Sequence, residues 1–216
     1  MKIKTEPVQI ILEDGKTIYG TLYLPENPNK LIVLLPENGS QKFHEFNKQL
    51  IEELIKKRYI VLQINLLTSQ EQQIYTKNLD IKTLSKRLNH VINWLLDKYN
   101  QKDLDIIVVG EGLNSAAMIK SANTIKDKIK TVISVSGRPD FADGELNKLE
   151  LPVLLIVGGR DINALETNLK AFNEIKSEKE LEIIPGISHE FKEEERYQDI
   201  IKLIHDWITK DRKKEA

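Results

Sequence analysis

The 216-residue sequence predicts one α/β domain, residues 1–216, built on a doubly wound, mostly parallel sheet of about eight strands. Two observations carry this prediction. Short apolar runs alternate with amphipathic helices along nearly the whole chain, as in folds whose helices cover both faces of a parallel sheet. An antiparallel hairpin opens the chain, because the turn pair Asp14-Gly15 separates two strand-like segments, Val8–Leu12 and Thr17–Leu24.

The remaining elements follow from the spacing of apolar residues. Continuous apolar runs are typical of strands buried on both faces, and apolar residues three and four positions apart are typical of helices. We expect strands at Leu31–Leu35, Tyr59–Leu66, Leu104–Val109, Thr131–Val135, Leu151–Val157 and Leu181–Ile184. We expect helices at Phe46–Lys57, Ile81–Tyr99, Gly112–Ala122, Ala164–Ile175 and Tyr197–Ile208. The segment Thr68–Asn78 has the composition of a polar loop, and the short connection from Val135 to Leu151 predicts no large cap domain.

The composition excludes several classes of function. The net charge of -1 gives no bulk attraction to nucleic acid, and no apolar run approaches the length of a membrane span. There is no cysteine, so disulfides and thiol chemistry are excluded. The four histidines show no metal-ligand spacing, and we expect neither a metal nor a cofactor. The N-terminus lacks the apolar core of a signal peptide, which favours the cytoplasm, with a signal removed earlier as the alternative.

A turn between a strand and a helix is the first candidate site. Gly110-Glu111-Gly112-Leu113-Asn114 follows the strand that ends at Val109, and a helix rich in small residues comes next. This context is typical of a nucleophile elbow, in which a serine would stand at position 112. Gly112 has no side chain, so the nucleophile is lost there. The alternatives are an ordinary turn or a phosphate cradle, and a fragment of a glycine-rich motif is weak evidence for the latter.

Two further loops carry an acid and a histidine. Asp161 follows Gly158-Gly159-Arg160 after one strand, and His189 lies in the loop after the last strand. The order elbow, acid, histidine is that of the α/β-hydrolases. Taken singly, Asp161 could be a helix N-cap and His189 a surface residue. Of the other histidines, we expect His90 and His205 to be structural, whereas His44 could border the site or open a helix.

The loop Pro36-Glu37-Asn38-Gly39-Ser40 occupies the place that helps to form an oxyanion hole in hydrolases. Such a hole takes one backbone N–H from this loop and one from the residue after the nucleophile, here Leu113. Proline has no N–H to donate, and an inward carboxylate at Glu37 would repel an oxyanion. Alternatively, Glu37 turns to solvent. Leu113, Glu37, Asn38 and Glu111 are therefore the candidate oxyanion and cleft residues.

Together these loops resemble the α/β-hydrolase superfamily, and within it the dienelactone-hydrolase-like branch. The resemblance covers almost the whole chain and is carried by Gln63–Thr68, Leu154–Asp161 and Ile184–His189. Leu35–Gly39 and the glycine at 112 are also similar to bacterial hydrolase-like proteins of unknown function that lack the serine. The resemblance implies ester or lactone hydrolysis by a nucleophile, a histidine and an acid, but no acyl-enzyme can form on Gly112.

The sequence therefore leaves alternative functions open. The first is a pseudo-hydrolase whose open cleft binds a small molecule or a protein. The second is an active hydrolase of the esterase or lactonase type, in which Asp161 and His189 activate water with help from Glu37 or Glu111. A purely structural domain, for instance a homodimer, is the third. Ser40 and Ser136 lie in loops that follow strands, and Ser115 lies one turn into a helix, but none has the elbow context of a replacement nucleophile.

Overall fold

One eight-stranded sheet organises the protein. A computed structural model describes residues 3–37, 43–73, 80–99, 104–189 and 191–212. The strand order is β1-β2-β4-β3-β5-β6-β7-β8, with β1 and β2 forming an antiparallel hairpin and β3 to β8 running parallel. The strands are β1 (Ile3–Ile11), β2 (Thr17–Pro25), β3 (Lys30–Leu35), β4 (Tyr59–Ile64), β5 (Asp105–Glu111), β6 (Thr131–Val135), β7 (Val153–Gly158) and β8 (Lys179–Ile184). This sheet confirms the predicted fold class.

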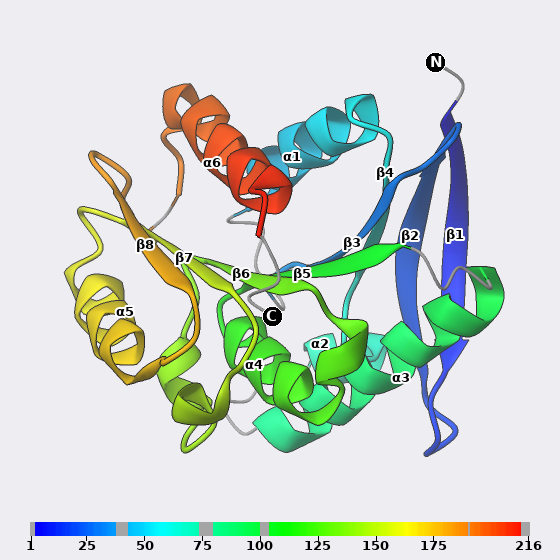
Figure 1. Ribbon diagram of the computed structural model, residues 1–216. Helices are drawn as coiled ribbons and strands as arrows, with labels where there is room; N and C mark the ends of the chain where they lie inside the picture. The colour runs from blue at the N-terminus through cyan, green and yellow to red at the C-terminus, as the bar shows by residue number, and fades with distance from the viewer. Residues whose placement is uncertain (1–2, 38–42, 74–79, 100–103, 190, 213–216) are drawn as a thin grey trace.

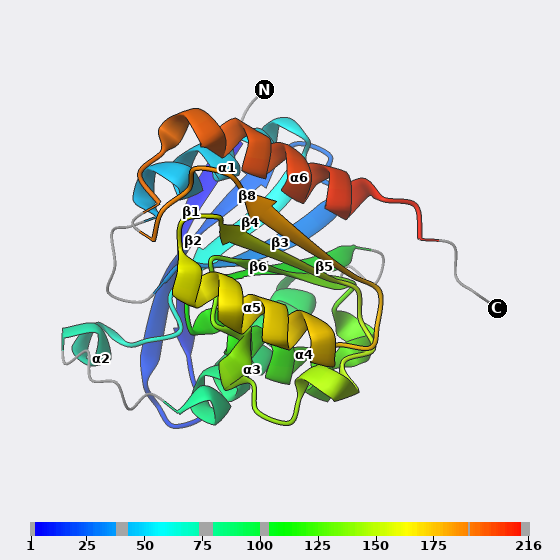
Figure 2. The ribbon, with the colours of Figure 1, turned by 90° about the vertical axis from the view of Figure 1, so that its left-hand side faces the viewer.

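Helices cover both faces of the sheet. The α-helices are α1 (His44–Lys56), α2 (Ser69–Gln73), α3 (Ile81–Tyr99), α4 (Asn114–Thr124), α5 (Ile162–Glu174) and α6 (Tyr197–Thr209). The described residues also form the 3₁₀ turns η1 (Lys126–Lys128), η2 (Pro139–Phe141), η3 (Leu146–Lys148) and η4 (Glu194–Arg196). Helices α1 and α6 lie on one face, and α3, α4 and α5 lie on the other (Figures 1 and 2). Each layer buries its own apolar cluster against the sheet.

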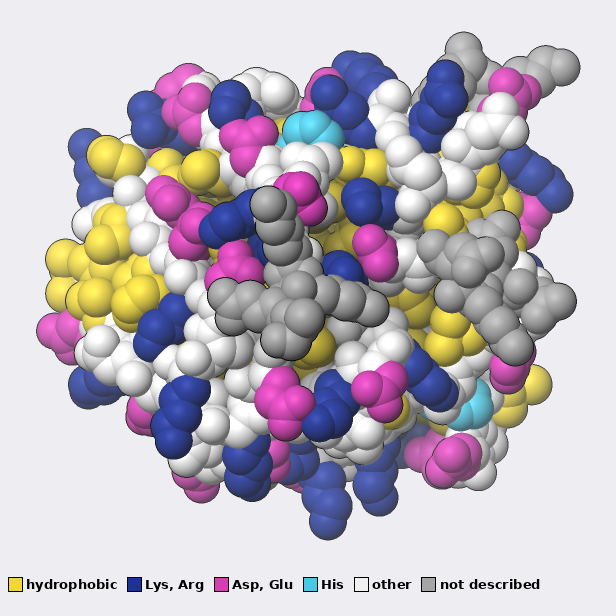
Figure 3. Space-filling view, viewed as in Figure 1, with side chains coloured by type: hydrophobic (Ala, Val, Ile, Leu, Met, Phe, Trp, Pro, Cys, Tyr) yellow, Lys and Arg dark blue, Asp and Glu magenta, His cyan; other side chains and the backbone are white. Residues whose placement is uncertain are grey.

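The carboxyl ends of the six parallel strands meet at one edge of the sheet, which is where this architecture places ligands. No cap domain stands between β6 and β7, because that connection holds only the short turns η2 and η3. In the part of the chain that the structure describes, no helix has both the length and the apolar composition needed to cross a membrane. Basic and acidic side chains are intermixed over the face seen in Figure 3, as the net charge of -1 suggests.

Helix α2 was not expected, because its residues fall in the segment predicted to be a loop. The sequence does carry its start signal, a capping box at Thr68-Ser69-Gln70-Glu71. The Glu71 backbone N–H donates to Thr68 Oγ1 at 3.2 Å, and the Thr68 N–H donates to Glu71 Oε2 at 3.0 Å. Two backbone N–H groups at the start of α2 thus have side-chain acceptors. These hydrogen bonds allow a short helix to form although it has no apolar face.

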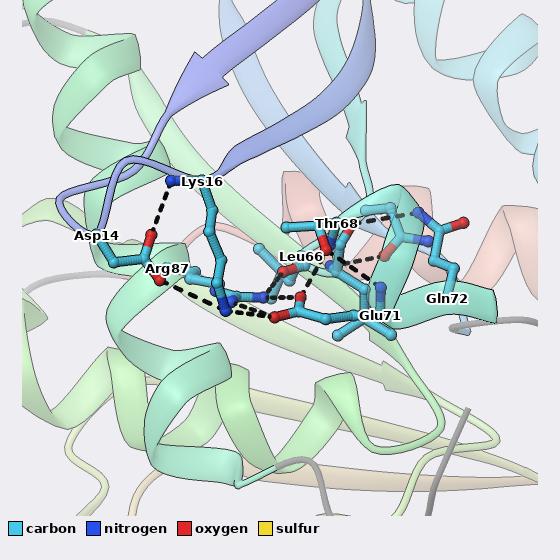
Figure 4. Close-up of polar contacts among 9 residues, drawn as sticks. Asp14, Lys16, Leu66, Thr68, Glu71, Gln72 and Arg87 are labelled. Atoms are coloured by element: carbon cyan, nitrogen blue, oxygen red, sulfur yellow. Dashed lines mark hydrogen bonds and ion pairs between the residues drawn. The ribbon is translucent and has the colours of Figure 1, made fainter. Parts of the chain in front are cut away.

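An ion pair holds α2 against the fold (Figure 4). Arg87 extends from α3, its side chain only 5% exposed, and donates two hydrogen bonds to the Glu71 carboxylate at 2.6 and 2.9 Å. Arg87 also donates to the Leu66 carbonyl at 2.8 Å, and Lys16 from the β1–β2 turn reaches Glu71 Oε1 at 2.9 Å. The Arg87 guanidinium, above all, holds the pKa of Glu71 far below its ordinary value.

Candidate functional site

The turn after β5 has the backbone geometry of an elbow. Gly112 adopts φ +52°, a left-handed conformation that ends the strand and delays α4 until Asn114, two residues later than predicted. The Gly112 carbonyl accepts a hydrogen bond from the Arg138 N–H at 2.9 Å, and Asn114 Nδ2 donates to the Pro36 carbonyl at 2.6 Å. Asn114 therefore stabilises the turn and ties it to the loop after β3.

The Glu37 side chain lies over this elbow. A Cβ atom built on Gly112 would stand 2.7 Å from Glu37 Oε1, 2.9 Å from Cγ and 3.1 Å from Cδ. These separations are shorter than van der Waals contact, so the glutamate occupies the space in which a side chain at position 112 would begin. Glu37 therefore turns inward, toward the elbow, and its carboxylate stands beside the N-terminal end of α4, where the helix dipole favours negative charge.

The side chain of Glu111 holds the backbone of Glu37 in place. Its side chain is fully buried, and its Oε2 accepts a hydrogen bond from the Glu37 backbone N–H at 2.9 Å. This N–H belongs to the loop that would contribute to an oxyanion hole, but it already donates its hydrogen bond to the Glu111 carboxylate. Because Glu111 is buried, it braces the Glu37 loop and does not line an open cleft. Asn38, the other candidate in this loop, lies outside the described residues.

Asp161 and His189 form a hydrogen-bonded pair. Asp161 Oδ2 lies 2.7 Å from His189 Nδ1, although the two residues are 28 positions apart in the chain. The Asp161 side chain is 7% exposed and that of His189 is 69% exposed. Because a carboxylate can only accept, Nδ1 is the donor of this hydrogen bond, and in a neutral imidazole Nε2 is then the nitrogen without a proton. Asp161 also caps α5, its Oδ1 accepting from the Ala164 N–H at 3.2 Å, so the cap and the pair coexist.

Backbone contacts between the ends of β7 and β8 hold the histidine loop in place. The Arg160 N–H donates to the Ile187 carbonyl and the Gly159 N–H to the Ile184 carbonyl, each at 2.9 Å. A Cβ at Gly158 would stand only 2.6 Å from the Ile187 oxygen, so this position admits no side chain. The absence of a side chain at Gly158 thus lets the histidine loop lie close to the acid loop, where His189 contacts Asp161.

Aromatic rings join the histidine loop to the loop that carries Glu37. Phe191, two residues after His189, is buried, and its ring centroid lies 4.7 Å from that of Phe43. Phe46 and Tyr197 pack around the same ring. The Tyr197 hydroxyl donates to the Phe191 carbonyl at 2.6 Å, and Phe191 keeps a left-handed φ of +52°. The cluster therefore brings the loops after β3 and β8 together at the same edge.

We expect Tyr197→Phe to lower the free energy of unfolding by about 1 kcal/mol, because it removes one buried hydrogen bond and leaves the Phe191 carbonyl unsatisfied. Urea denaturation measures this loss. Tyr99→Phe is the matched control, since the buried Tyr99 hydroxyl has no hydrogen-bond partner among the described residues. Equal losses in the two variants would contradict a special role for the Tyr197 hydroxyl.

The other candidate residues lie apart from this chemistry or outside the described part of the chain. Ser115 is fully buried and donates to the Gly110 carbonyl at 2.9 Å, so it packs toward the sheet. Ser136 follows β6 with φ +47° and is 7% exposed, whereas Ser40 falls outside the described residues. His44 opens α1, and His205 lies 3.4 Å from the Tyr59 hydroxyl. No three carboxylate or imidazole groups gather as a metal site within the described residues.

The chain is similar to known proteins in both sequence and structure. No protein-family model matches the chain. Two Mycobacterium tuberculosis proteins named "Putative phosphoribosyl transferase" are 31% identical to it over 206 residues, which are 95% of this chain and 46% of each of theirs. The chain thus spans about half the length of the curated relatives it matches. A dienelactone hydrolase from Anabaena variabilis is 27% identical, with a TM-score of 0.87 over 96% of this chain and 98% of that one.

This is the α/β-hydrolase fold. An alpha-beta serine hydrolase homologue from Coxiella burnetii shares it with a TM-score of 0.72, at 19% identity over 92% of this chain and 95% of the other. The order of the strands and the loops after β3, β5, β7 and β8 agree with this assignment. Sequence reasoning located all four loops. It did not find that Glu37 covers Gly112 or that Glu111 holds the Glu37 amide, because no sequence pattern specifies those side-chain contacts.

Proposed function

We propose that the protein is a pseudo-hydrolase whose retained cleft binds a small molecule or a protein. The observation that carries this proposal is the pairing of Gly112 with Glu37. The elbow has no side chain to form an acyl-enzyme, and a carboxylate stands in the space that such a side chain would take. The amide of Glu37 is also bound to Glu111, which removes a donor from the loop that would stabilise an oxyanion.

The charge of the cleft bears on its ligand. Glu37 presents a carboxylate beside Gly112, and the basic nitrogen of His189 stands at the same edge of the sheet. Such a cleft favours ligands that donate hydrogen bonds or carry positive charge, and it disfavours a phosphate on the glycine turn. This charge therefore argues against phosphoribosyl transfer, the activity for which the longer relatives are named.

The test is the reactivity of the purified protein toward serine-directed reagents and simple esters. We expect no covalent labelling by a fluorophosphonate and no turnover of 4-nitrophenyl acetate above that of a His189→Ala variant, because no serine stands at the elbow. A ligand of the cleft should raise the unfolding temperature of the protein, and less so in Glu37→Ala. Ester turnover that disappears in His189→Ala would refute the pseudo-hydrolase proposal.

A second candidate function is hydrolysis without a serine. Its specific support is the 2.7 Å contact between Asp161 and His189, with His189 exposed. An imidazole oriented by a buried carboxylate is the arrangement of a general base that can take a proton from water. In this second function His189 takes a proton from water, with help from the carboxylate of Glu37 beside Gly112.

A further inference from the structure

Strand β8 ends the sheet and leaves its outer edge open. Among the described strands it pairs only with β7, and α6 and α5 flank it on the two faces (Figure 2). The Val153 N–H donates to the Glu178 carbonyl, and the Gly159 N–H donates to the Ile184 carbonyl, each at 2.9 Å. Alternate residues of a parallel strand bond the same neighbour, so the odd-numbered residues of β8 direct their N–H and C=O groups to the open edge.

An acidic groove lies beside this edge on the face that α6 covers. It has a volume of about 370 Å³, and its lining includes Glu180 and Glu182 of β8 and Asp206 and Trp207 of α6. Lys210 Nζ lies 2.7 Å from Glu180 Oε1 and 5.0 Å from the centre of the Trp207 ring, so this groove already holds one ammonium group. No described residue forms an ion pair with Glu182. Its carboxylate is therefore available to a second cation.

The other face of the same edge is apolar. Ile183 of β8 is exposed, and Leu181 packs against the apolar cluster that α5 helps to form. Ile162 and Leu169 of α5 are exposed as well, and Figure 3 shows hydrophobic side chains gathered at the left, where α5 lies in Figure 1. Because successive residues of a strand point to opposite faces, residues 180–183 present carboxylates on one face and apolar side chains on the other.

We propose that the open edge of β8 binds an extended segment of another protein in which basic and apolar residues alternate. The segment adds a strand to the sheet, and its backbone bonds the odd-numbered residues of β8. Its basic side chains enter the acidic groove beside Glu182, and its apolar side chains pack on Ile183 and α5. This surface includes neither Gly112 nor Glu37, so the inference does not depend on the function of the cleft.

The charge of β8 argues against a second copy of this chain as the occupant. Glu178, Glu180 and Glu182 alternate along the chain and therefore share one face of the strand. Two-fold pairing of β8 with itself sets residues of the same face opposite each other, so carboxylates would stand against carboxylates. Like charges at such positions are destabilising, whereas a basic strand places an opposite charge there. The complementary partner is thus a basic segment.

Peptide binding tests the proposal, with fluorescence anisotropy as the measurement. A short labelled peptide in which lysine and valine alternate should bind the purified protein. A peptide of the same composition with its lysines in one block should bind at least about tenfold more weakly, because its side chains cannot divide between the two faces. Absence of binding by the alternating peptide, or equal binding by the blocked one, overturns the inference.

N-methylated peptides separate strand pairing from charge attraction. Methylation of every second residue removes the N–H donors from one edge of the peptide strand and leaves its charge unchanged. Of the two alternating peptides methylated in opposite registers, one should lose binding and the other should keep it, since only one edge of the peptide faces β8. If both bind as the unmethylated peptide does, charge alone holds the peptide and the proposal fails.

Protein variants locate the site. Glu182→Lys should weaken binding of the alternating peptide at least about tenfold. Glu52→Lys is the matched control, because it makes the same change of charge at an exposed position of α1, which packs against β4. Ile183→Pro removes an N–H from the open edge but spares the bonds to β7, and it should also abolish binding. Thermal unfolding shows whether each variant is folded. Equal weakening by Glu182→Lys and Glu52→Lys, or full binding by folded Ile183→Pro, contradicts the proposed site.

Discussion

Arg87→Met is expected to lower the free energy of unfolding by about 3 kcal/mol at neutral pH. The substitution keeps an unbranched apolar stem but removes both hydrogen bonds to Glu71 and the one to the Leu66 carbonyl. The carboxylate of Glu71, whose side chain is 22% exposed, would then remain partly buried with Lys16 as its remaining cation. Urea denaturation at about pH 7 measures the loss.

The same ion pair predicts a dependence on pH. Arg87 lowers the pKa of Glu71 in the folded state, so the pair stabilises the fold fully above the ordinary pKa of a glutamate, about 4.3. This contribution is lost as the pH falls below that value toward the depressed pKa of the folded state. Arg87→Met should therefore show a smaller loss of stability between about pH 7 and about pH 3 than the unmodified protein.

Two further variants separate the ion pair from simple packing. Lys16→Met removes an exposed partner of the same carboxylate and should cost less than about 1 kcal/mol. Arg87→Met combined with Glu71→Gln should recover part of the loss, because the glutamine removes the charge yet keeps an acceptor for the Thr68 amide. If the double variant is no more stable than Arg87→Met alone, the cost does not come from an unpaired charge.

The fold could be predicted because its signals are local and repeated. A continuous apolar run such as Leu31–Leu35 reflects burial on two faces of the sheet, and the helical spacing of α3 and α6 reflects burial on one face of each helix. The prediction failed at α2, where the capping box was present but no apolar periodicity accompanied it. The buried pair of Arg87 and Glu71 was not predicted either, because it joins residues 16 positions apart through side chains whose partner only the folded chain defines.

The candidate site could be predicted in its backbone but not in its side-chain contacts. Glycine-rich turns and the order of the loops located Gly112, Asp161 and His189, since each follows a strand that ends at the same edge of the sheet. Whether Glu37 faced solvent or the elbow could not be read from sequence, because both orientations satisfy a charged side chain in a loop. The contact of Glu37 with Gly112 depends on the position that Glu111 gives to the Glu37 amide.

Gly112→Ser is expected to produce little serine esterase activity by itself. The new Cβ would meet Glu37 Oε1 at 2.7 Å and Cγ at 2.9 Å, so the glutamate must move before the serine fits. A non-glycine residue at φ +52° also adds backbone strain of about 1 to 2 kcal/mol. Moreover, a carboxylate beside the serine opposes the negative charge that develops in acyl transfer.

Removal of Glu37 should change this result. In Gly112→Ser combined with Glu37→Ala, the space over the elbow is open and the opposing charge is gone, while Asp161 and His189 keep their 2.7 Å contact. We expect the double variant to hydrolyse 4-nitrophenyl acetate at least about tenfold faster than Gly112→Ser. The free energy of unfolding of the double variant should also be higher, by about 1 kcal/mol, than the sum of the two separate changes predicts. Urea denaturation of the two single variants and the double variant measures this coupling.

Adding His189→Ala to the double variant is the decisive control, because it leaves the introduced serine and the open elbow in place but removes the base. If activity depends on His189, the acid and histidine of the original hydrolase arrangement are intact, and Gly112 and Glu37 together form the block to serine chemistry. If the double variant is folded but inactive, the block to acyl transfer is the hydrogen bond between the backbone N–H of residue 37 and Glu111. In that case a serine alone cannot restore acyl transfer, since the loop after β3 still withholds a donor from the oxyanion.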